Sequence, residues 1–282
     1  MFMKCAYLYI LCSLVVLTEA VVTQAYIIPS EQILTLMIDK FGPADSLVVS
    51  QKTVLYDPSL EGGTRELEET LYYGYPDRFR SEVRTPGLKR IQVVNQDDTV
   101  IIIGGKIVGE TESLFDHFKD LLLYRKTGLL VDRLSQLGVN LQVVSLGRFN
   151  DKVVYVIGAK YPDDSVPQVW IDKNTFRPIG LILGNGCGET PLRRVEYHDY
   201  HTEPNQRGGY PMRILFFENG SLVRMHQLDV VQTNSPVPDR LFDVAYLKSI
   251  SQSVAPTLPA PSPVFELNEV KEGIESFKRA YE

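Results

Sequence analysis

Apolar and polar residues alternate through most of the chain, and this two-residue period predicts β-strands. Residues 64–75 show the pattern clearly, because Leu71, Tyr73 and Tyr75 fall on one face and acidic residues fall on the other. In the strand that follows, Phe79 takes the face opposite to the neighbouring arginines. Strands of this kind bury one face of a sheet and leave the other toward water.

Turn residues separate the alternating segments, and two of the turns are specific. The pairs Gly104-Gly105 and Asn219-Gly220 predict two-residue hairpins, because both positions of such a loop need positive φ. The expected strands are residues 47–56, 64–75, 78–83, 88–95, 100–103, 106–108, 153–159, 166–171, 178–183, 192–200, 211–217 and 222–231. Strand follows strand without βαβ alternation. This predicts a mainly β (α+β) fold, a strongly curved and incompletely closed antiparallel β-barrel capped by helices.

A helical period of apolar residues interrupts the strands near the start and in the middle of the chain. The expected helices are residues 31–41, 112–125 and 127–137, with Ser30 and Thr111 as N-caps and Gly42 and Gly138 as stops. The helix over residues 112–125 has a wide apolar stripe that includes Phe115, Phe118 and Leu122. That stripe fits core packing, and it also fits a lid over an apolar cavity.

The two ends of the chain lack the alternating strand pattern of its middle. Residues 1–25 have a basic start at Lys4 and a short apolar run, which predicts a signal peptide cleaved after Ala25 and an exported, periplasmic protein. The expected main domain is 26–250, followed by a Pro-rich linker over 251–263 and an amphipathic helix over 264–282. That last helix either docks back on the sheet or binds another protein.

Cysteine content and charge narrow the class of protein further. Cys5 and Cys12 fall within the expected signal peptide, so Cys187 is left without an internal disulfide partner. An exported chain without disulfides favours a bacterial periplasm. The net charge of −6 disfavours nucleic acid and anionic membranes as partners.

The search for catalytic chemistry finds no convergent set of residues. His198 and His201 are the best metal candidates, but residues three apart on a strand point to opposite faces. The segment 184-GNGCG-188 is followed by a strand instead of the helix that a phosphate loop requires. The charged tip of 168-QVWIDKNTFRPIG-180 has turn chemistry, with Asn174 tolerant of a left-handed backbone. We therefore expect no catalysis, no cofactor and no metal.

Several segments, taken in order, resemble the LolA/LolB-like superfamily of periplasmic lipoprotein carriers. They are 72-YYGYPDRFRSEV-83, 98-DTVIIIGGKIV-108, 168-QVWIDKNTFRPIG-180 and 229-DVVQTNSPVPDRLFDV-244. The resemblance implies a half-open sheet that encloses an apolar cavity for acyl chains, without catalysis. Many relatives have a basic residue directly before the strand proline, and this chain has Tyr75 there.

The resemblance leads to a functional hypothesis, a carrier or chaperone that shields the acyl chains of lipoproteins or lipids. Shielding is needed because each exposed CH2 group costs roughly 0.8 kcal/mol in water. The expected cavity and lid residues are Leu71, Tyr73, Tyr75, Phe79, Phe115, Phe118, Leu122 and Trp170. We expect a monomer, with an inner- or outer-membrane protein as a further partner through the last helix.

Two other hypotheses remain open at this point. The same fold would serve as an envelope protein-interaction or stress-sensor module if its interior were filled and no cargo were carried. A hydrolase of unknown type is the third hypothesis.

Overall fold

The computed structural model describes residues 28–58, 62–85, 88–184, 192–200 and 209–253. The expected signal peptide, His201, Cys187 and the expected C-terminal helix lie outside these residues. Of the expected linker, only residues 251–253 are described, and they continue a helix.

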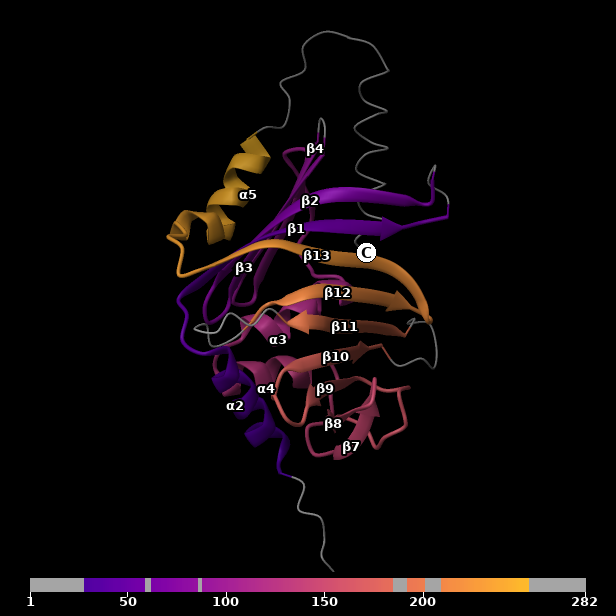
Figure 1. The fold of residues 1–282 in the computed structure, drawn as a ribbon. Coiled ribbons are helices and arrows are strands. Elements are labelled where there is room, and N and C mark those ends of the chain that lie inside the picture. The colour runs from indigo at the N-terminus through magenta and orange to yellow at the C-terminus, as the bar shows by residue number, and fades with distance from the viewer. Residues whose placement is uncertain (1–27, 59–61, 86–87, 185–191, 201–208, 254–282) are drawn as a thin grey trace, which may run out of the picture.

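Thirteen strands in the described residues form one antiparallel sheet (Figure 1). The strands are β1 (Ser46–Tyr56), β2 (Thr64–Gly74), β3 (Arg78–Thr85), β4 (Leu88–Asn95), β5 (Asp98–Ile103), β6 (Lys106–Gly109), β7 (Val144–Phe149), β8 (Lys152–Ile157), β9 (Gln168–Asp172), β10 (Pro178–Leu183), β11 (Arg193–Tyr200), β12 (Pro211–Glu218) and β13 (Ser221–Thr233). Their order is β6-β5-β4-β3-β2-β1-β13-β12-β11-β10-β9-β8-β7.

This order describes two meanders joined by one long-range pairing. Strands β1–β6 follow one another, strands β7–β13 do the same, and β13 returns to pair with β1. The sheet curves strongly, and its terminal strands β6 and β7 do not pair with each other within the described structure. The predicted fold class, a curved and incompletely closed antiparallel barrel with helices, is confirmed.

Local sequence accounts for the tightest turns of the sheet. Gly104 and Gly105 have φ of 56° and 78° in the hairpin between β5 and β6, and Asn219 and Gly220 have φ of 49° and 83° between β12 and β13. Both pairs adopt the left-handed backbone that a two-residue hairpin requires. These turns set the register of the strands that they join.

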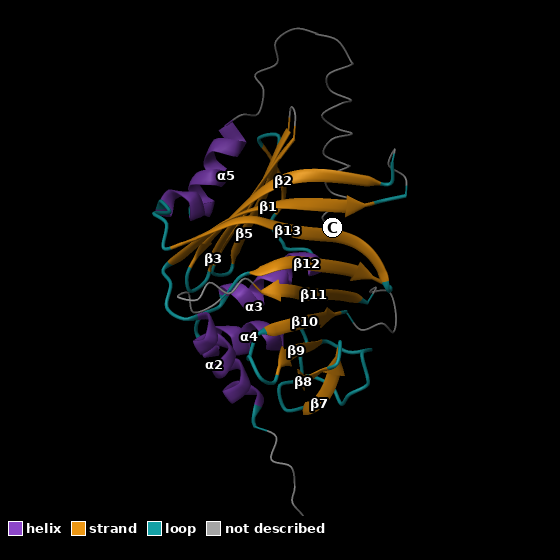
Figure 2. Ribbon diagram, viewed as in Figure 1, coloured by secondary structure: helices purple, strands orange, loops and turns teal. Residues whose placement is uncertain are grey.

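Six helical segments in the described part of the chain accompany the sheet, and Figure 2 shows the α-helices among them. They are α2 (Ser30–Phe41), the 3-10 helix η1 (Leu114–Lys119), α3 (Asp120–Leu123), α4 (Thr127–Gln136), the 3-10 helix η2 (Asp239–Phe242) and α5 (Val244–Ser253). Of these, η2 and α5 were not expected from the sequence. The stops after α2 and α4 agree with the prediction.

Both predicted N-caps are wrong. Ser30 is the first residue of α2, and its hydroxyl donates to the carbonyl oxygen of Leu141 at 2.7 Å instead of capping the helix. In the middle of the chain, Ser113 is the N-cap of η1, and its backbone amide donates to the carboxylate of Asp116 at 2.9 Å. The expected helix over 112–125 is therefore shorter, and Glu112 lies before it.

The helices cover the two faces of the sheet separately. The main apolar core contains residues of α2, η1, α3 and α4 together with one face of the strands, so these helices fill the concave side. Val244 and Leu247 of α5, with Phe242 of η2, pack on the opposite face against Val93 and Ile102. We call η1 and α3 together the plug, because their side chains occupy the interior of the curved sheet.

A network of buried charges anchors the plug. Lys119 and Asp120 are each 0% exposed at their side chains and form an ion pair of 3.0 Å. Glu112 accepts from Lys119 and, at 2.6 Å, from Arg133 of α4. Arg133 also donates to Asp120 at 2.9 Å, and His117 Nδ1 lies 3.1 Å from Asp120.

Burial alone would raise the pKa of Asp120, but the cations Lys119 and Arg133 and a hydrogen bond with His117 hold it well below its usual value. Each charge in the network therefore depends on its partners being in place.

Replacing Asp120 by Asn tests this dependence. The substitution leaves Lys119 and Arg133 short of a buried counter-charge, which typically costs about 3–5 kcal/mol in the free energy of unfolding. The matched control is Arg213→Gln, which removes a half-exposed pair with Asp199 and should cost less than about 1 kcal/mol. Urea unfolding of the three proteins gives both values, and equal costs would show that the network does not anchor the plug.

Candidate functional site

The interior of the sheet gathers seven of the eight residues predicted for a cavity and its lid. Leu71, Tyr73 and Phe79 come from β2 and β3 and are buried. The plug contributes the buried residues Phe115, Phe118 and Leu122, and Tyr75 lies at the margin of the same core.

Aromatic rings fill the space between plug and sheet. Phe118 contacts Phe79 and Phe216 edge to face, with ring centroids 6.5 Å and 5.5 Å apart. Phe115 makes the same kind of contact with Phe216 at 5.5 Å. Tyr197 donates from its hydroxyl to the carbonyl oxygen of Phe118 at 2.7 Å and so fixes the plug from the opposite wall. In this state the plug, and not an open space, occupies the centre of the interior.

Trp170 is the exception among the predicted residues, because it lies on the other face of the sheet. Its neighbours Val169 and Ile171 point into the main core, whereas Trp170 packs with Val154, Val156 and Ile179 in a separate cluster. The prediction that Trp170 lines the interior is wrong. A period of two residues separates the faces of a strand but does not show which face is concave.

The hairpin that contains Trp170 is a structural turn. Asp172 Oδ1 accepts hydrogen bonds from the backbone amides of Asn174 and Thr175 at 2.9 Å and 2.8 Å. The left-handed residue is Phe176, with φ of 54°, and not Asn174 as expected. Gly180 sits beneath the indole, where a Cβ would lie 2.8 Å from the Trp170 ring. The charged tip therefore shapes a turn, as predicted.

A polar row crosses the interior beside the aromatic rings. Glu69 is buried and accepts hydrogen bonds from Gln51, Thr53 and Ser81 at 2.9, 2.6 and 2.6 Å. Burial would raise the pKa of Glu69, but the charge that His226 carries when protonated and the hydrogen bonds from these three donors outweigh it, and the pKa falls below its usual value. A fixed negative charge thus lies within the sheet.

His226 is the polar residue of this row that lacks a hydrogen bond. It is 2% exposed, and neither ring nitrogen has a hydrogen-bond partner within the described residues. Its ring lies against Phe216 and Phe118, with centroids 4.6 Å and 5.1 Å apart, and Nε2 is 3.8 Å from Glu69. Burial lowers the pKa of His226 to about 4, so the ring is neutral near pH 7.

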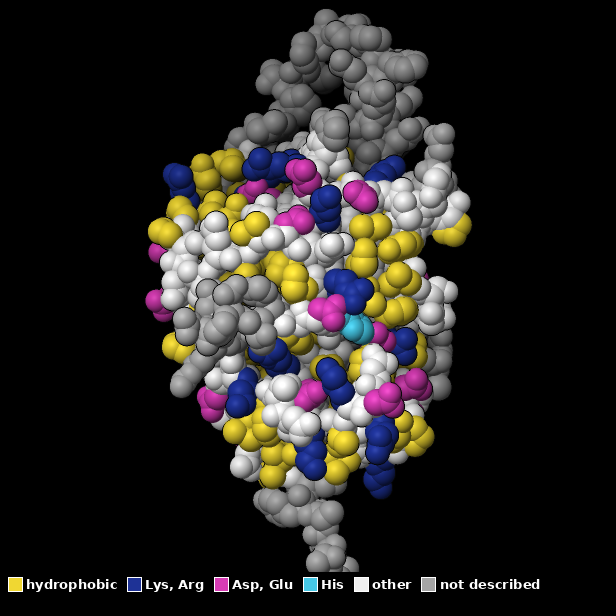
Figure 3. Space-filling view, viewed as in Figure 1, with side chains coloured by type: hydrophobic (Ala, Val, Ile, Leu, Met, Phe, Trp, Pro, Cys, Tyr) yellow, Lys and Arg dark blue, Asp and Glu magenta, His cyan; other side chains and the backbone are white. Residues whose placement is uncertain are grey.

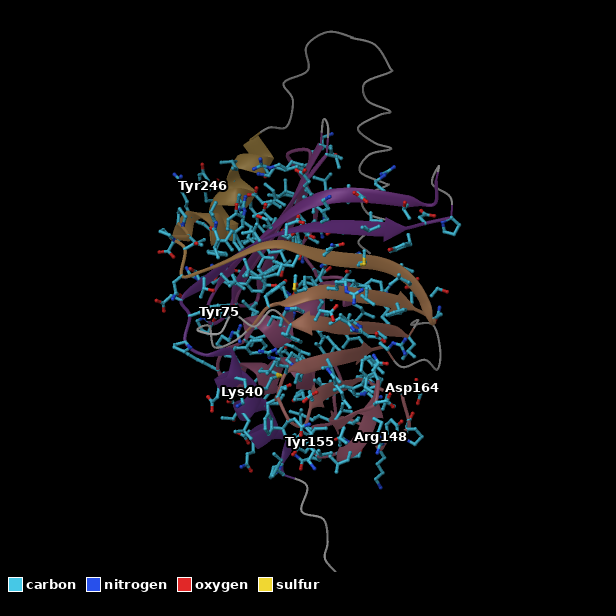
Figure 4. The ribbon with its side chains drawn as sticks, in the orientation of Figure 1. Lys40, Tyr75, Arg148, Tyr155, Asp164 and Tyr246 are labelled. Carbon is cyan, nitrogen blue, oxygen red and sulfur yellow. The ribbon has the colours of Figure 1, made fainter. Side chains whose placement is uncertain are left out.

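A cleft of about 470 Å³ opens at the margin of the interior. It is lined by the end of α2 and the loop that follows it, by Tyr75-Pro76, and by Arg125-Lys126 between α3 and α4. Figure 4 labels Tyr75 and, near α2, Lys40 on the same side of the molecule. We call this space the mouth cleft, because Tyr75 and Ile38 in its wall also pack against the main core.

Arg125 is held tightly in the wall of the mouth cleft. Its guanidinium carbon lies 3.9 Å from the ring centre of Phe41 and 4.6 Å from that of Tyr75. Nη2 donates to the Tyr75 hydroxyl at 3.0 Å. The buried atoms Nε and Nη1 have no hydrogen-bond partner within the described structure.

Sequence reasoning missed Arg125, Glu69 and His226. Glu69 had a detectable signal, because it falls on the same strand face as Leu67 and Leu71. The partners of Arg125 and His226 are distant in sequence, so no local pattern could indicate them.

The described residues give no support to a metal site. His198 Nε2 lies 3.0 Å from Glu196 on the same strand, and His201 is outside the described residues. Within residues 28–253, gaps excepted, no group of three or more His, Cys, Asp or Glu side chains could hold a metal ion. Charged side chains of both signs are scattered over the face seen in Figure 3.

Solved structures share this architecture. A LolA superfamily protein from Nitrosomonas europaea matches with a TM-score of 0.53 and 12% identity over 78% of this chain and 100% of its own. A domain from Vibrio parahaemolyticus described as an outer membrane lipoprotein-sorting protein gives a TM-score of 0.53 and 10% identity over 77% and 97%. The chain has the LolA fold.

Further comparisons show that the similarity extends to another solved structure but not to protein-family models or curated sequences. A DUF1329 family protein from Desulfovibrio piger gives a TM-score of 0.50 and 10% identity, covering 78% of this chain and 99% of its own. The sequence matches no protein-family model and no curated protein. The predicted resemblance is thus confirmed at the level of the LolA fold. In the described part of the chain, no helix has the length and apolar character needed to cross a membrane.

The low pKa of His226 predicts how this LolA-like chain responds to acid. An unfolded histidine binds a proton below pH 6.5, whereas the folded one resists protonation down to about 4. Stability that is present above pH 6.5 is therefore lost as pH falls toward 4, by about 3 kcal/mol for a shift of this size. The unfolding free energies of wild type and His226→Phe, measured across this range, should diverge by about that amount, and a constant difference would refute the prediction.

The position of Trp170 predicts that its fluorescence does not report on the interior of the LolA fold. Titration with an acyl-chain ligand should leave the emission of Trp170 unchanged. A Trp170→Phe, Phe118→Trp protein should instead respond, because its indole would lie in the plug. A saturable change of Trp170 emission in the wild type would place the ligand on the outer face.

Proposed function

We propose that this protein is a periplasmic carrier or chaperone that shields acyl chains of lipids or lipoproteins inside its curved sheet. The observation that carries the proposal is the apolar concave face of the sheet. It is covered by η1 and α3, two short helical segments whose apolar rings an acyl chain could replace. The LolA fold, shared with a domain described as lipoprotein-sorting, supports the same function.

Energetics are compatible with exchange of plug and cargo. Phe115 and Phe118 are apolar, so an acyl chain that replaces them would preserve the apolar contacts of Phe79 and Phe216. The favourable free energy of binding comes from the cargo, because each CH2 group removed from water contributes roughly 0.8 kcal/mol. Affinity then equals this gain less the cost of moving the plug.

A second candidate function is a protein-interaction module with the same fold and no cargo. The observation that favours it is the packed state of the interior, where Phe118 contacts Phe79, Phe216 and His226. In addition, Tyr246 and Ile250 of α5 are exposed, at 53% and 41%, on the outside of the sheet. If this second function holds, the full chain and a chain lacking residues 254–282 should both recover protein partners in a pull-down. Neither protein should contain bound lipid.

Acyl binding distinguishes the two functions. For a carrier, native mass spectrometry of protein purified from its own envelope fraction should show bound lipid or lipopeptide, and a fluorescent fatty acid should bind saturably. Leu71→Phe enlarges a buried residue of the interior and should lower affinity for the probe about tenfold.

Val156→Phe is the matched control. Val156 is equally buried but lies in the cluster on the opposite face, so this variant should bind like the wild type. Absence of saturable binding in the wild type, together with lipid-free native protein, would reject the carrier.

A further inference from the structure

The mouth cleft has a chemical character that the apolar interior does not explain. Arg125 and Lys126 line it from the loop between α3 and α4, and Asp39 and Asp45 line it from the α2 side. The lining therefore holds two cations and two carboxylates in a space of about 470 Å³, a volume within the usual range for small-molecule sites. An acyl chain has no charged or hydrogen-bonding groups that could pair with these side chains.

The unpaired nitrogens of Arg125 point to a missing acceptor. A buried guanidinium N–H without a partner is costly and needs an explanation in a native structure. Nε and Nη1 are in this state, while Nη2 is satisfied by Tyr75. Arg125 and Tyr75 both line the cleft, and the guanidinium carbon lies 4.6 Å from the centre of the Tyr75 ring.

The start of α4 adds donors beside Arg125. Lys126 is the N-cap, with no side-chain cap hydrogen bond, and the first turn contains no acidic residue. The first amides of a helix lack intrahelical acceptors and favour anions. Phosphate oxygens are suitable acceptors for both this helix end and a planar guanidinium.

We propose that the mouth cleft binds the zwitterionic head group of a phospholipid-like amphiphile, with its phosphate at Arg125 and its ammonium at Asp39 and Asp45. A head group with both charges matches the lining, whereas a simple anion would also face the two carboxylates. The inference rests on the proposed function, because the acyl chain of the same molecule would enter the interior behind Tyr75. Arg125 itself lines the cleft, so the phosphate would meet the guanidinium there.

Calorimetric titration of the full chain with lauroyl ligands that differ only in head group tests the proposal. The ligands are lysophosphatidylethanolamine, lysophosphatidic acid and monoacylglycerol. The wild type should bind lysophosphatidylethanolamine at least about tenfold tighter than monoacylglycerol, as expected for one charge-assisted contact. Arg125→Gln should abolish that preference, so that lysophosphatidylethanolamine and monoacylglycerol bind with equal affinity.

Two variants serve as matched comparisons. Lys40→Gln removes a cation at the end of α2 that does not line the cleft, and it should bind all three ligands like the wild type. Asp39→Asn combined with Asp45→Asn should weaken lysophosphatidylethanolamine but not lysophosphatidic acid. If Arg125→Gln melts early, Arg125→Lys keeps the cation but loses the planar fork, and it should retain part of the preference.

Each alternative outcome has a distinct meaning. Equal wild-type affinity for the phosphate ligands and monoacylglycerol would overturn the head-group site and leave acyl carriage standing. An equal loss for all ligands in Arg125→Gln would give Arg125 a structural role only, and would also overturn the site. Failure of every acyl ligand would reject the proposed function itself. Binding of chain-free glycerophosphoethanolamine as tight as the lysolipid would overturn the assignment to a lipid in favour of a soluble phosphate ester.

Discussion

The buried charges around Asp120 are the interaction on which the architecture depends. A sheet whose two end strands stay unpaired cannot bury its concave face by closure, so another element must cover that face. The plug does so, and Lys119, Glu112 and Arg133 fix its position. Buried ion pairs add little net stability over apolar packing, but a misplaced partner is heavily penalised. The network therefore specifies one seat for the plug. Because its charges regain hydration when exposed to water, this kind of anchor is also compatible with a plug that leaves and returns.

The interior behind the plug is layered. Phe79, Phe216 and the plug rings form an apolar zone, and Glu69 with its three donors and His226 form a polar row beside it. Glu69 has three hydrogen-bond donors, whereas neutral His226 packs against the rings of Phe118 and Phe216 and makes no hydrogen bond within the described residues. Burying an imidazole without a hydrogen bond costs free energy, and water could satisfy its nitrogens if it reached them. The tight aromatic packing around His226 keeps water away from the ring. An occupant of the interior would thus meet apolar walls first and a polar boundary behind them.

Much of the sheet was predictable because its determinants are local. The hairpins at Gly104-Gly105 and Asn219-Gly220 follow from backbone conformation alone, and α2 follows from its apolar period and Gly42. The plug was placed less well, because Glu112 leaves the expected helix to meet Lys119 and Arg133, and such distant ion pairs leave no periodic signal. The predicted position of Trp170 was wrong for a related reason. Alternation shows which residues of a strand share a face, but it does not show which face of the sheet is concave. Arg125 needed three distant segments to meet before its role could be recognised.

The position before the strand proline links these observations. This chain has Tyr75 where many LolA/LolB-like proteins have a basic residue, yet a guanidinium still reaches that place, because Arg125 stacks on the Tyr75 ring and donates to its hydroxyl. In this chain the cation comes from the loop that follows the plug and not from the strand. Arg125 is two residues beyond the end of α3, so the chain joins it directly to the plug, as it would not join a cation on the strand. A ligand that drew Arg125 away from Tyr75 would therefore also act on the element that fills the sheet.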